Sequence, residues 1–252
     1  WRYTEAVTAI KNQGQCGSVR ARAQTLWMHP CCIPSVAAAV FVRCMLIARV
    51  LCAHHAQCWA FSATESVESA YVLAGNTTVV MAPQELVDCS KGLFSNHGCS
   101  GGWYYYAWKW LGDHKSMKES DYPYTSGVDG KETKGAYDES KGVTNVSSYQ
   151  QVKGTDNIKA ALEQQPVSVA VSAGNNVFRN YTSGVVTEAD GCPTRVDHAI
   201  QAVGWGNDGT QDYYIVRNSW NTTWGDKGYI KIATGDGKGV CGINQDIYSP
   251  TI

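Results

Sequence analysis

The sequence feature that most constrains the fold is a motif that is split in two. The string NQGQCGS ends at Ser18 and the string CWAFS begins at Cys58, with residues 19–57 between them. This segment has four Arg, four Cys and three His residues but no Lys, Asp, Glu, Gly, Asn or Tyr. Polar surface loops favour Gly, Asn and Asp, so residues 19–57 differ from an ordinary loop joining two elements.

Composition is that of an ordinary globular protein. The 252 residues can bury the core of one large domain or two small ones. A formal net charge of −1 without a basic stripe argues against a nucleic-acid partner. A content of 17% charged and 11% aromatic residues argues against disorder. The chain opens at Trp1 without a signal peptide, so we expect a fragment of a longer precursor.

Cysteines and glycosylation sequons indicate the secretory route. The chain has ten cysteines outside any CxxC pair, and four Asn-x-Ser/Thr sequons at Asn76, Asn145, Asn180 and Asn221. Both features are typical of proteins from oxidising compartments. We therefore expect the protein in the lysosome or vacuole, or outside the cell.

Residue spacing predicts a helical first half and a β-rich second half. Small and apolar residues over 58–74 recur at helical spacing, with Gly75 as a stop. A second helix is predicted over 102–111, and 122–141 is predicted to be loop. Short β-type runs punctuated by glycine follow at 166–171, 198–206, 212–220 and 228–233. This division suggests two subdomains with a cleft between them.

Four residues can be given roles in nucleophilic catalysis. A nucleophilic thiol needs a lowered pKa, which a helix N-terminus and an imidazolium partner supply. Cys58 opens the predicted helix, and His198 in VDHAI can be the imidazole partner. Asn218 in RNSW can orient that imidazole. Gln13 would lie six positions before Cys58 without residues 19–57, and its amide can bind an oxyanion together with the Cys58 N–H.

These residues lie in strings that resemble the papain-like cysteine peptidases. The matching strings are NQGQCGS and CWAFS once joined, GCSGG at 98–102, VDHAI, GWG, NSW followed by WGDKGYIKI, and VCGI at 240–243. The resemblance implies an α+β fold with a helical subdomain over 1–147 and a β-rich subdomain over 148–252. It also implies thioester chemistry carried by Gln13, Cys58, His198 and Asn218, with neither metal nor organic cofactor.

The resemblance also implies a substrate cleft. Trp220 would shield the bond from His198 to Asn218, or simply be a core aromatic residue. The pocket for the second residue before the scissile bond would have Asp246 as its floor. Its walls would be Trp103, Tyr104, Ala170, Val196 and Ala199, and further cleft residues would be Gly101, Gly102 and Asp197. We expect this pocket to accept bulky apolar residues, and Arg when Asp246 is ionised. The alternative is that Asp246 points to solvent.

The same resemblance implies two disulfides, Cys16 with Cys99 and Cys192 with Cys241. The family's third bridge would join Cys89 to a cysteine in the loop after Tyr124, where this chain has Thr133. We therefore expect Cys89 to be an unpaired, buried thiol. A further difference is Asn221, which stands where the family has Gly after NSW.

Residues 19–57 admit several interpretations. A membrane span over 33–53 is disfavoured by Arg43 and Arg49. None of the standard zinc spacings occurs among the candidate ligands Cys31, Cys32, Cys44, Cys52, His54 and His55. We prefer a retained intron, because Val19-Arg20 can be encoded by a splice-donor sequence and Gln57 by the acceptor CAG. Removal of the segment keeps the reading frame and restores the motif.

Two functions follow from the sequence. The first is a monomeric cysteine endopeptidase acting on peptides or proteins, with its own propeptide and cystatin-like inhibitors as partners by resemblance. The second is a non-catalytic relative that is disabled by residues 19–57, because they separate Gln13 from Cys58. A misplacement of about 1 Å can cost about 100-fold in rate.

Overall fold

The computed structural model describes residues 4–14, 57–92 and 95–252. Of the predicted insert, it describes Gln57. In the first half, helices predominate. They are α2 (Cys58–Leu73), α3 (Pro83–Cys89), α4 (Tyr104–Asp113) and α5 (Ser126–Asp129), with short 3-10 helices η1 (Gly98–Ser100) and η2 (Glu139–Lys141). The helix predicted over 58–74 is α2. The helix predicted over 102–111 is α4, which starts at Tyr104 because Trp103 has an extended backbone.

The second half is built around a sheet. Its strands are β1 (Ser148–Gln151), β2 (Val167–Val171), β3 (Val185–Val186), β4 (His198–Asn207), β5 (Asp212–Arg217), β6 (Tyr229–Ala233) and β7 (Ile247–Thr251). Among the described residues the strands form one sheet in the order β1-β7-β2-β4-β5-β6-β3, antiparallel except where β3 meets β6. Between the strands lie α6 (Thr155–Gln164), α7 (Asn176–Arg179), η3 (Glu188–Asp190) and η4 (Val240–Gly242). The four predicted β runs correspond to β2, β4, β5 and β6.

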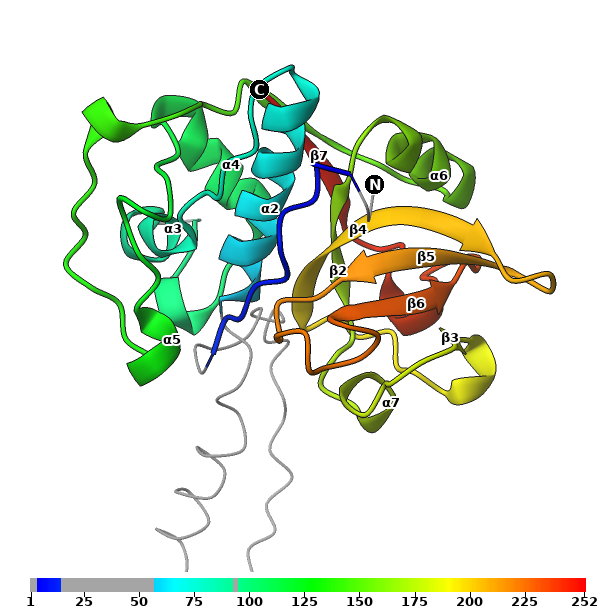
Figure 1. Cartoon of the computed structure of the whole chain (residues 1–252). Coiled ribbons are helices and arrows are strands. Elements are labelled where there is room, and N and C mark those ends of the chain that lie inside the picture. Colours follow the sequence, from blue (N-terminus) through cyan, green and yellow to red (C-terminus); the bar gives the residue numbers. More distant parts are fainter. Residues whose placement is uncertain (1–3, 15–56, 93–94) are drawn as a thin grey trace, which may run out of the picture.

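Helix α2 lies between the other helices of the first half and the sheet (Figure 1). Cys58–Ala70 are all buried, so both sides of the helix need a packing partner. One side joins an apolar cluster with α3 and α4 that includes Trp59, Val67 and Trp108. The side toward the sheet is polar: Ser62 Oγ donates to the Ile200 carbonyl at 2.8 Å. Hydrogen bonds therefore replace hydrophobic periodicity on that side, since buried polar groups need partners.

The N-terminal segment 4–14 runs along α2 and reaches the sheet (Figure 1). The Ser69 hydroxyl of α2 donates to the Ala6 carbonyl at 2.7 Å. The buried Arg217 Nη1, at the end of β5, donates to the Thr8 carbonyl at 2.7 Å. These contacts fix the segment between α2 and the sheet.

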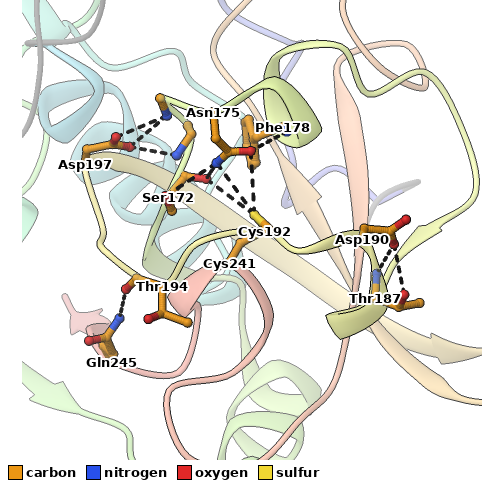
Figure 2. The surroundings of a disulfide bond; sticks show 12 residues. Ser172, Asn175, Phe178, Thr187, Asp190, Cys192, Thr194, Asp197, Cys241 and Gln245 are labelled. Carbon is orange, nitrogen blue, oxygen red and sulfur yellow. Dashed lines mark hydrogen bonds between the residues drawn. A yellow bond between two sulfur atoms is a disulfide. The ribbon is translucent and has the colours of Figure 1, made fainter.

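The disulfide from Cys192 to Cys241 ties the loop before β4 to η4, with a Cα–Cα distance of 5.0 Å (Figure 2). Cys99 is also disulfide-bonded; its predicted partner, Cys16, lies outside the described residues. The cysteines and histidines considered above as metal ligands also lie outside the described residues: Cys31, Cys32, Cys44, Cys52, His54 and His55.

Cys89 carries a free thiol, as predicted, but it is half-buried rather than fully buried. The prediction that Thr133 stands opposite it is wrong. The Thr133 hydroxyl instead donates to Asp88 Oδ2 at 2.5 Å, and its N–H donates to Asp88 Oδ1 at 2.7 Å. The residue that faces Cys89 is Gly135, where an added Cβ would lie 3.1 Å from the Cys89 sulfur. Asp88 therefore holds this loop by hydrogen bonds.

Candidate active site

Cys58 is the first residue of α2 and is fully buried. The carbonyl of Gln57 accepts from the N–H groups of Ala60 at 2.9 Å and Phe61 at 3.3 Å, which begins the helix. The first N–H groups of a helix point outward without an intrahelical acceptor, and the helix dipole favours negative charge there. The N-terminus of α2 therefore favours an anionic sulfur at Cys58.

His198 and Asn218 lie on neighbouring strands. His198 opens β4, Asn218 follows β5, and both are fully buried. His198 Nε2 lies 2.8 Å from Asn218 Oδ1. The same oxygen accepts from the Ser219 N–H at 2.8 Å, so it is an acceptor and the imidazole must donate to it. This fixes the tautomer in which Nδ1 is the ring nitrogen able to exchange a proton with a thiol.

An aromatic cage covers this pair. The Trp220 ring stacks on His198 with centroids 4.8 Å apart and planes 28° apart. Phe178 of α7 lies edge-on to both rings, at 5.6 Å from Trp220 and 6.2 Å from His198. Trp224 stacks on Phe178 at 5.2 Å. Exclusion of water by these rings strengthens the hydrogen bond to Asn218.

Gln13 is held in place by Ser219, and among the described residues its amide NH₂ has no partner. Its N–H donates to the Ser219 carbonyl at 2.9 Å, and its Oε1 accepts from the Ser219 hydroxyl at 2.6 Å. The residue is 1% exposed, and Nε2 has no hydrogen-bond partner within the part of the chain that the structure describes. A buried unpaired donor is costly unless a ligand pairs with it, and an oxyanion is such a ligand.

A buried charge pair lies directly behind Asn218. Arg217, the preceding residue, is fully buried with Nε 3.5 Å from Glu65 Oε2 of α2. Burial raises the pKa of Glu65 to about 7, although Arg217 and Lys11 lower it. Next to it, Lys11 pairs with Glu68. These contacts join the strand that carries Asn218 to the helix that carries Cys58.

The backbone conformation and the close packing at the last two glycines of GCSGG disfavour any larger residue. Gly101 has a φ of 108°, which favours glycine. A Cβ on Gly102 would lie 2.2 Å from Asn96 Oδ1 and 2.9 Å from the Trp59 ring. Trp103 follows with its N–H donated to the same Asn96 oxygen at 2.7 Å, and its ring is partly exposed. The chain is therefore pressed against the core immediately before α4.

Three of the predicted pocket residues present almost no surface. Tyr104 and Ala170 are fully buried and Ala199 is 1% exposed, whereas Trp103, Val196 and Asp246 are partly exposed. The Tyr104 hydroxyl donates to the Asp246 carbonyl at 2.5 Å. Burial raises the pKa of the Asp246 carboxyl above its ordinary value, so this side chain is not fully turned to solvent.

The carboxylate of Asp197 accepts hydrogen bonds from backbone N–H groups of the protein. Oδ1 accepts from the Ala173 N–H at 2.7 Å, and Oδ2 accepts from the Gly174 N–H at 3.1 Å (Figure 2). Its own N–H donates to the Val171 carbonyl at 2.9 Å. Asp197 thus anchors the chain just before His198, in addition to its predicted place in the cleft.

Asn221 follows the NSW string, and its backbone has a conformation that glycine adopts readily. Its φ is 68°, in the left-handed region. Asn enters this region more readily than most residues, and its Oδ1 accepts from the Thr222 N–H at 2.6 Å. The side chain is exposed, so the departure from glycine is accommodated locally.

Sequence reasoning missed three residues around the site. Ser219 anchors Gln13, Phe178 completes the aromatic cage, and Tyr124 donates to the Gln13 carbonyl at 2.6 Å. Ser219 lies within the NSW string and could have been singled out. Phe178 and Tyr124 come from segments whose position follows only from the tertiary fold.

The described residues contain no group of three or more His, Cys, Asp or Glu side chains placed to hold a metal ion. Within the same residues, no helix has the length and apolar character needed to cross a bilayer.

Comparison with known proteins identifies the family. A sequence profile described as "Papain family cysteine protease" matches residues 52–251. The chain is 37% identical to "Cysteine proteinase COT44" of Brassica napus, covering 96% of this chain and 62% of that protein. It is 34% identical to "Cathepsin L-like proteinase" of Fasciola hepatica, covering 96% and 61%. Against "Probable cysteine protease RD21C" of Arabidopsis thaliana the identity is 34%, covering 100% and 47%.

Solved structures show the same fold. The bromelain protease from Ananas comosus, solved in complex with the E64 inhibitor, matches with a TM-score of 0.74 and 30% identity, covering 100% of this chain and 97% of that one. Procathepsin L 3 of the Tenebrio molitor larval midgut matches with a TM-score of 0.76 and 28% identity, covering 100% and 68%. The chain spans 47 to 62% of the length of the three curated relatives named above. The predicted α+β papain-like fold is confirmed, and the chain belongs to the papain family of cysteine proteases.

Proposed function

We propose that this chain is a cysteine endopeptidase that hydrolyses peptide bonds through a thioester intermediate. The observation that carries the proposal is the buried bond of 2.8 Å from His198 to Asn218, which leaves Nδ1 for the thiol. It is supported by the position of Cys58 at the N-terminus of α2 and by the unpaired amide of Gln13.

The reaction follows from these roles. The Cys58 sulfur, having given its proton to His198, attacks the carbonyl carbon of the scissile bond. The carbonyl oxygen becomes an oxyanion that accepts from Gln13 Nε2 and the Cys58 N–H. His198 then protonates the leaving amine as the C–N bond breaks, which leaves a thioester. Water, deprotonated by His198, attacks the thioester and releases the acid and the thiol.

Labelling with E-64, the inhibitor bound to the bromelain relative, tests the nucleophile. We expect the 252-residue chain, matured from a form with a suitable propeptide, to be labelled at Cys58 and to hydrolyse peptides at mildly acidic pH. Cys58→Ala should abolish both, while Cys89→Ala, which removes the half-buried thiol, should retain both. Undiminished turnover by Cys58→Ala contradicts the assignment, and a chain without labelling or turnover supports the non-catalytic alternative.

The pocket for the second residue before the scissile bond is proposed to involve Asp246. Its partly exposed carboxylate can pair with Arg, beside the apolar surfaces of Trp103 and Val196. Because its pKa is raised, acceptance of Arg should weaken as the pH falls and the carboxyl is protonated. The ratio of kcat/KM for Arg-Arg and Phe-Arg substrates, measured with wild type and Asp246→Ala, tests this. An unchanged ratio contradicts it.

Further proposals concern the whole protein. We propose the subdomain division 1–147 and 148–252, supported by the grouping of helices before β1 and strands after it. A propeptide partner is supported by the procathepsin structure among the relatives. A lysosomal, vacuolar or extracellular location is supported by the disulfide of Cys192 with Cys241.

The retained-intron origin of residues 19–57 is also a proposal. It is supported by the start of α2 at Cys58, directly after the segment, and by the family match beginning only at residue 52. Sequencing of the messenger RNA across these codons tests it. A transcript population in which all copies carry the segment contradicts it.

A further inference from the structure

The Tyr124 hydroxyl lies between the two segments that carry Gln13 and Cys58. It donates to the Gln13 carbonyl at 2.6 Å and also contacts the side-chain amide of Gln57, the residue before Cys58. Its ring packs edge-on against Phe61 in the first turn of α2, with centroids 4.8 Å apart and planes at 88°. Tyr124 therefore contacts the segment of the oxyanion donor and the start of the helix at once.

The Tyr124 hydroxyl, the Gln13 carbonyl and the Gln57 side-chain amide form one connected hydrogen-bond network. A phenol has one hydrogen, and the Gln13 carbonyl and Gln57 Oε1 both accept, so these two oxygens share that hydrogen. Gln57 presents Oε1 to the phenol, and its Nε2 donates to Cys99 Sγ at 3.0 Å. Gln57 is fully buried, and both ends of its side-chain amide are paired, so loss of the Tyr124 hydroxyl would leave a buried acceptor without its donor.

The loop around Tyr124 presses on the same segment. A Cβ on Gly14 would lie 2.3 Å from the Gly127 carbonyl oxygen, and Gly14 has a φ of 60°. The backbone of Tyr124 is itself fixed, since its N–H donates to Glu119 Oε1 at 2.9 Å. Gln13 is thus held by Ser219 from the sheet side and by the Tyr124 loop from the helical side.

We propose that Tyr124 is a positioning residue that fixes the oxyanion donor Gln13 relative to the start of α2. The proposal rests on the peptidase function proposed above. Tyr124 contacts no reacting atom in this mechanism, so its effect is carried by the placement of Gln13. Because the oxyanion forms only in the transition state, loss of this placement affects kcat more than KM.

Steady-state kinetics of the full chain test this role. Tyr124→Phe keeps the ring and removes the hydroxyl. We expect kcat to fall about 10-fold while KM changes less than about 2-fold, as for loss of an interaction made only in the transition state. The matched control is Tyr137→Phe, whose hydroxyl accepts from the Lys115 N–H at 2.9 Å and pairs with Glu139 on an exposed surface. An unchanged kcat for Tyr124→Phe, or an equal loss in the control, overturns the proposal.

A second measurement does not depend on activity. Thermal unfolding of the full chain is compared for wild type, Tyr124→Phe, Gln57→Ala and the double variant. We expect the decrease in Tm of the double variant to be smaller than the sum of the single decreases, because both changes remove the same contact. Additive decreases overturn the proposal. If wild type shows no turnover or E-64 labelling, the proposed function fails while this cycle still tests the contact.

Discussion

His198 and Asn218 stand on paired strands, whereas Gln13 and Cys58 come from segments separated by residues 15–56. The first pair is held by the pairing of β4 with β2 and β5, by the hydrogen bond between the two side chains and by the stacked ring of Trp220. The second pair is fixed by side chains, chiefly the hydroxyls of Ser219 and Tyr124. Residues that are far apart in the sequence can therefore form one site when tertiary hydrogen bonds hold them together.

The largest loss of activity is expected for Gln13, which belongs to the pair held by side-chain hydrogen bonds. Gln13→Ala removes the unpaired amide donor, and loss of one oxyanion donor typically lowers kcat about 100- to 1000-fold. The measurement is kcat and KM of the full chain on a peptide substrate. Replacement of the exposed neighbour Asn12 by Ala is the control. A loss below about 10-fold for Gln13→Ala would mean that the amide lies outside the oxyanion site.

A smaller loss of activity is expected for the pair of His198 and Asn218. Asn218→Ala removes the acceptor that fixes the His198 tautomer, but Trp220 and Phe178 still hold the ring. We expect kcat/KM to fall about 10- to 100-fold, less than the loss of about 10⁴-fold seen when a triad's orienting group imposes the wrong tautomer. Asn207→Ala, at the far end of β4, is the control. A greater loss than for Gln13→Ala would reverse the comparison between the two pairs.

Deletion of residues 19–57 sharpens the comparison further. In that form Ser18 would take the place of Gln57 directly before Cys58, so the contact of Tyr124 with Gln57 would be lost and the covalent chain itself would hold Gln13 near the helix start. We expect Tyr124→Phe to lower kcat less than about 3-fold there, against about 10-fold in the full chain, since positioning by one constraint makes a second less important. Equal losses in the two forms would show that Tyr124 acts independently of the connecting segment.

The smallest expected effect concerns stability rather than rate. Burial raises the pKa of Glu85 in α3 from 4.5 to about 8, against the opposing hydrogen bond that the Met117 N–H donates to Glu85 Oε2 at 2.7 Å. The folded state therefore binds a proton more tightly than the unfolded state. The contribution of this tighter proton binding to the free energy of unfolding is fully present below pH 4.5. It is lost as the pH rises through 8, by at most about 1.4 kcal/mol per pH unit.

Urea unfolding at pH 5, 6.5 and 8 checks this sign. We expect Glu85→Gln, which mimics the protonated side chain, to flatten the decline in unfolding free energy between pH 5 and pH 8. Glu139→Gln, at an exposed position, should leave most of the decline in place. A decline that is equally steep in Glu85→Gln and wild type would show that another group is responsible.

The sequence by itself determined the elements with strong local patterns. Helical spacing over 58–74 and the runs now seen as β2, β4, β5 and β6 were predictable, because local periodicity reports which face is buried. The strings around Cys58, His198 and Asn218 likewise gave the candidate site residues. Helix α6 and strands β1 and β7 escaped prediction, since short elements carry little periodic signal and depend on their tertiary partners.

Only the tertiary structure decided how the site residues are held. Gly135 rather than Thr133 faces Cys89, and Tyr104 is fully buried. Tyr124 reaches Gln13 across 111 positions of sequence. Such contacts depend on side-chain directions and on the close approach of distant loops, which residue types and spacing along the chain do not specify. The family could therefore be predicted from the sequence, whereas the contacts that hold the candidate site could not.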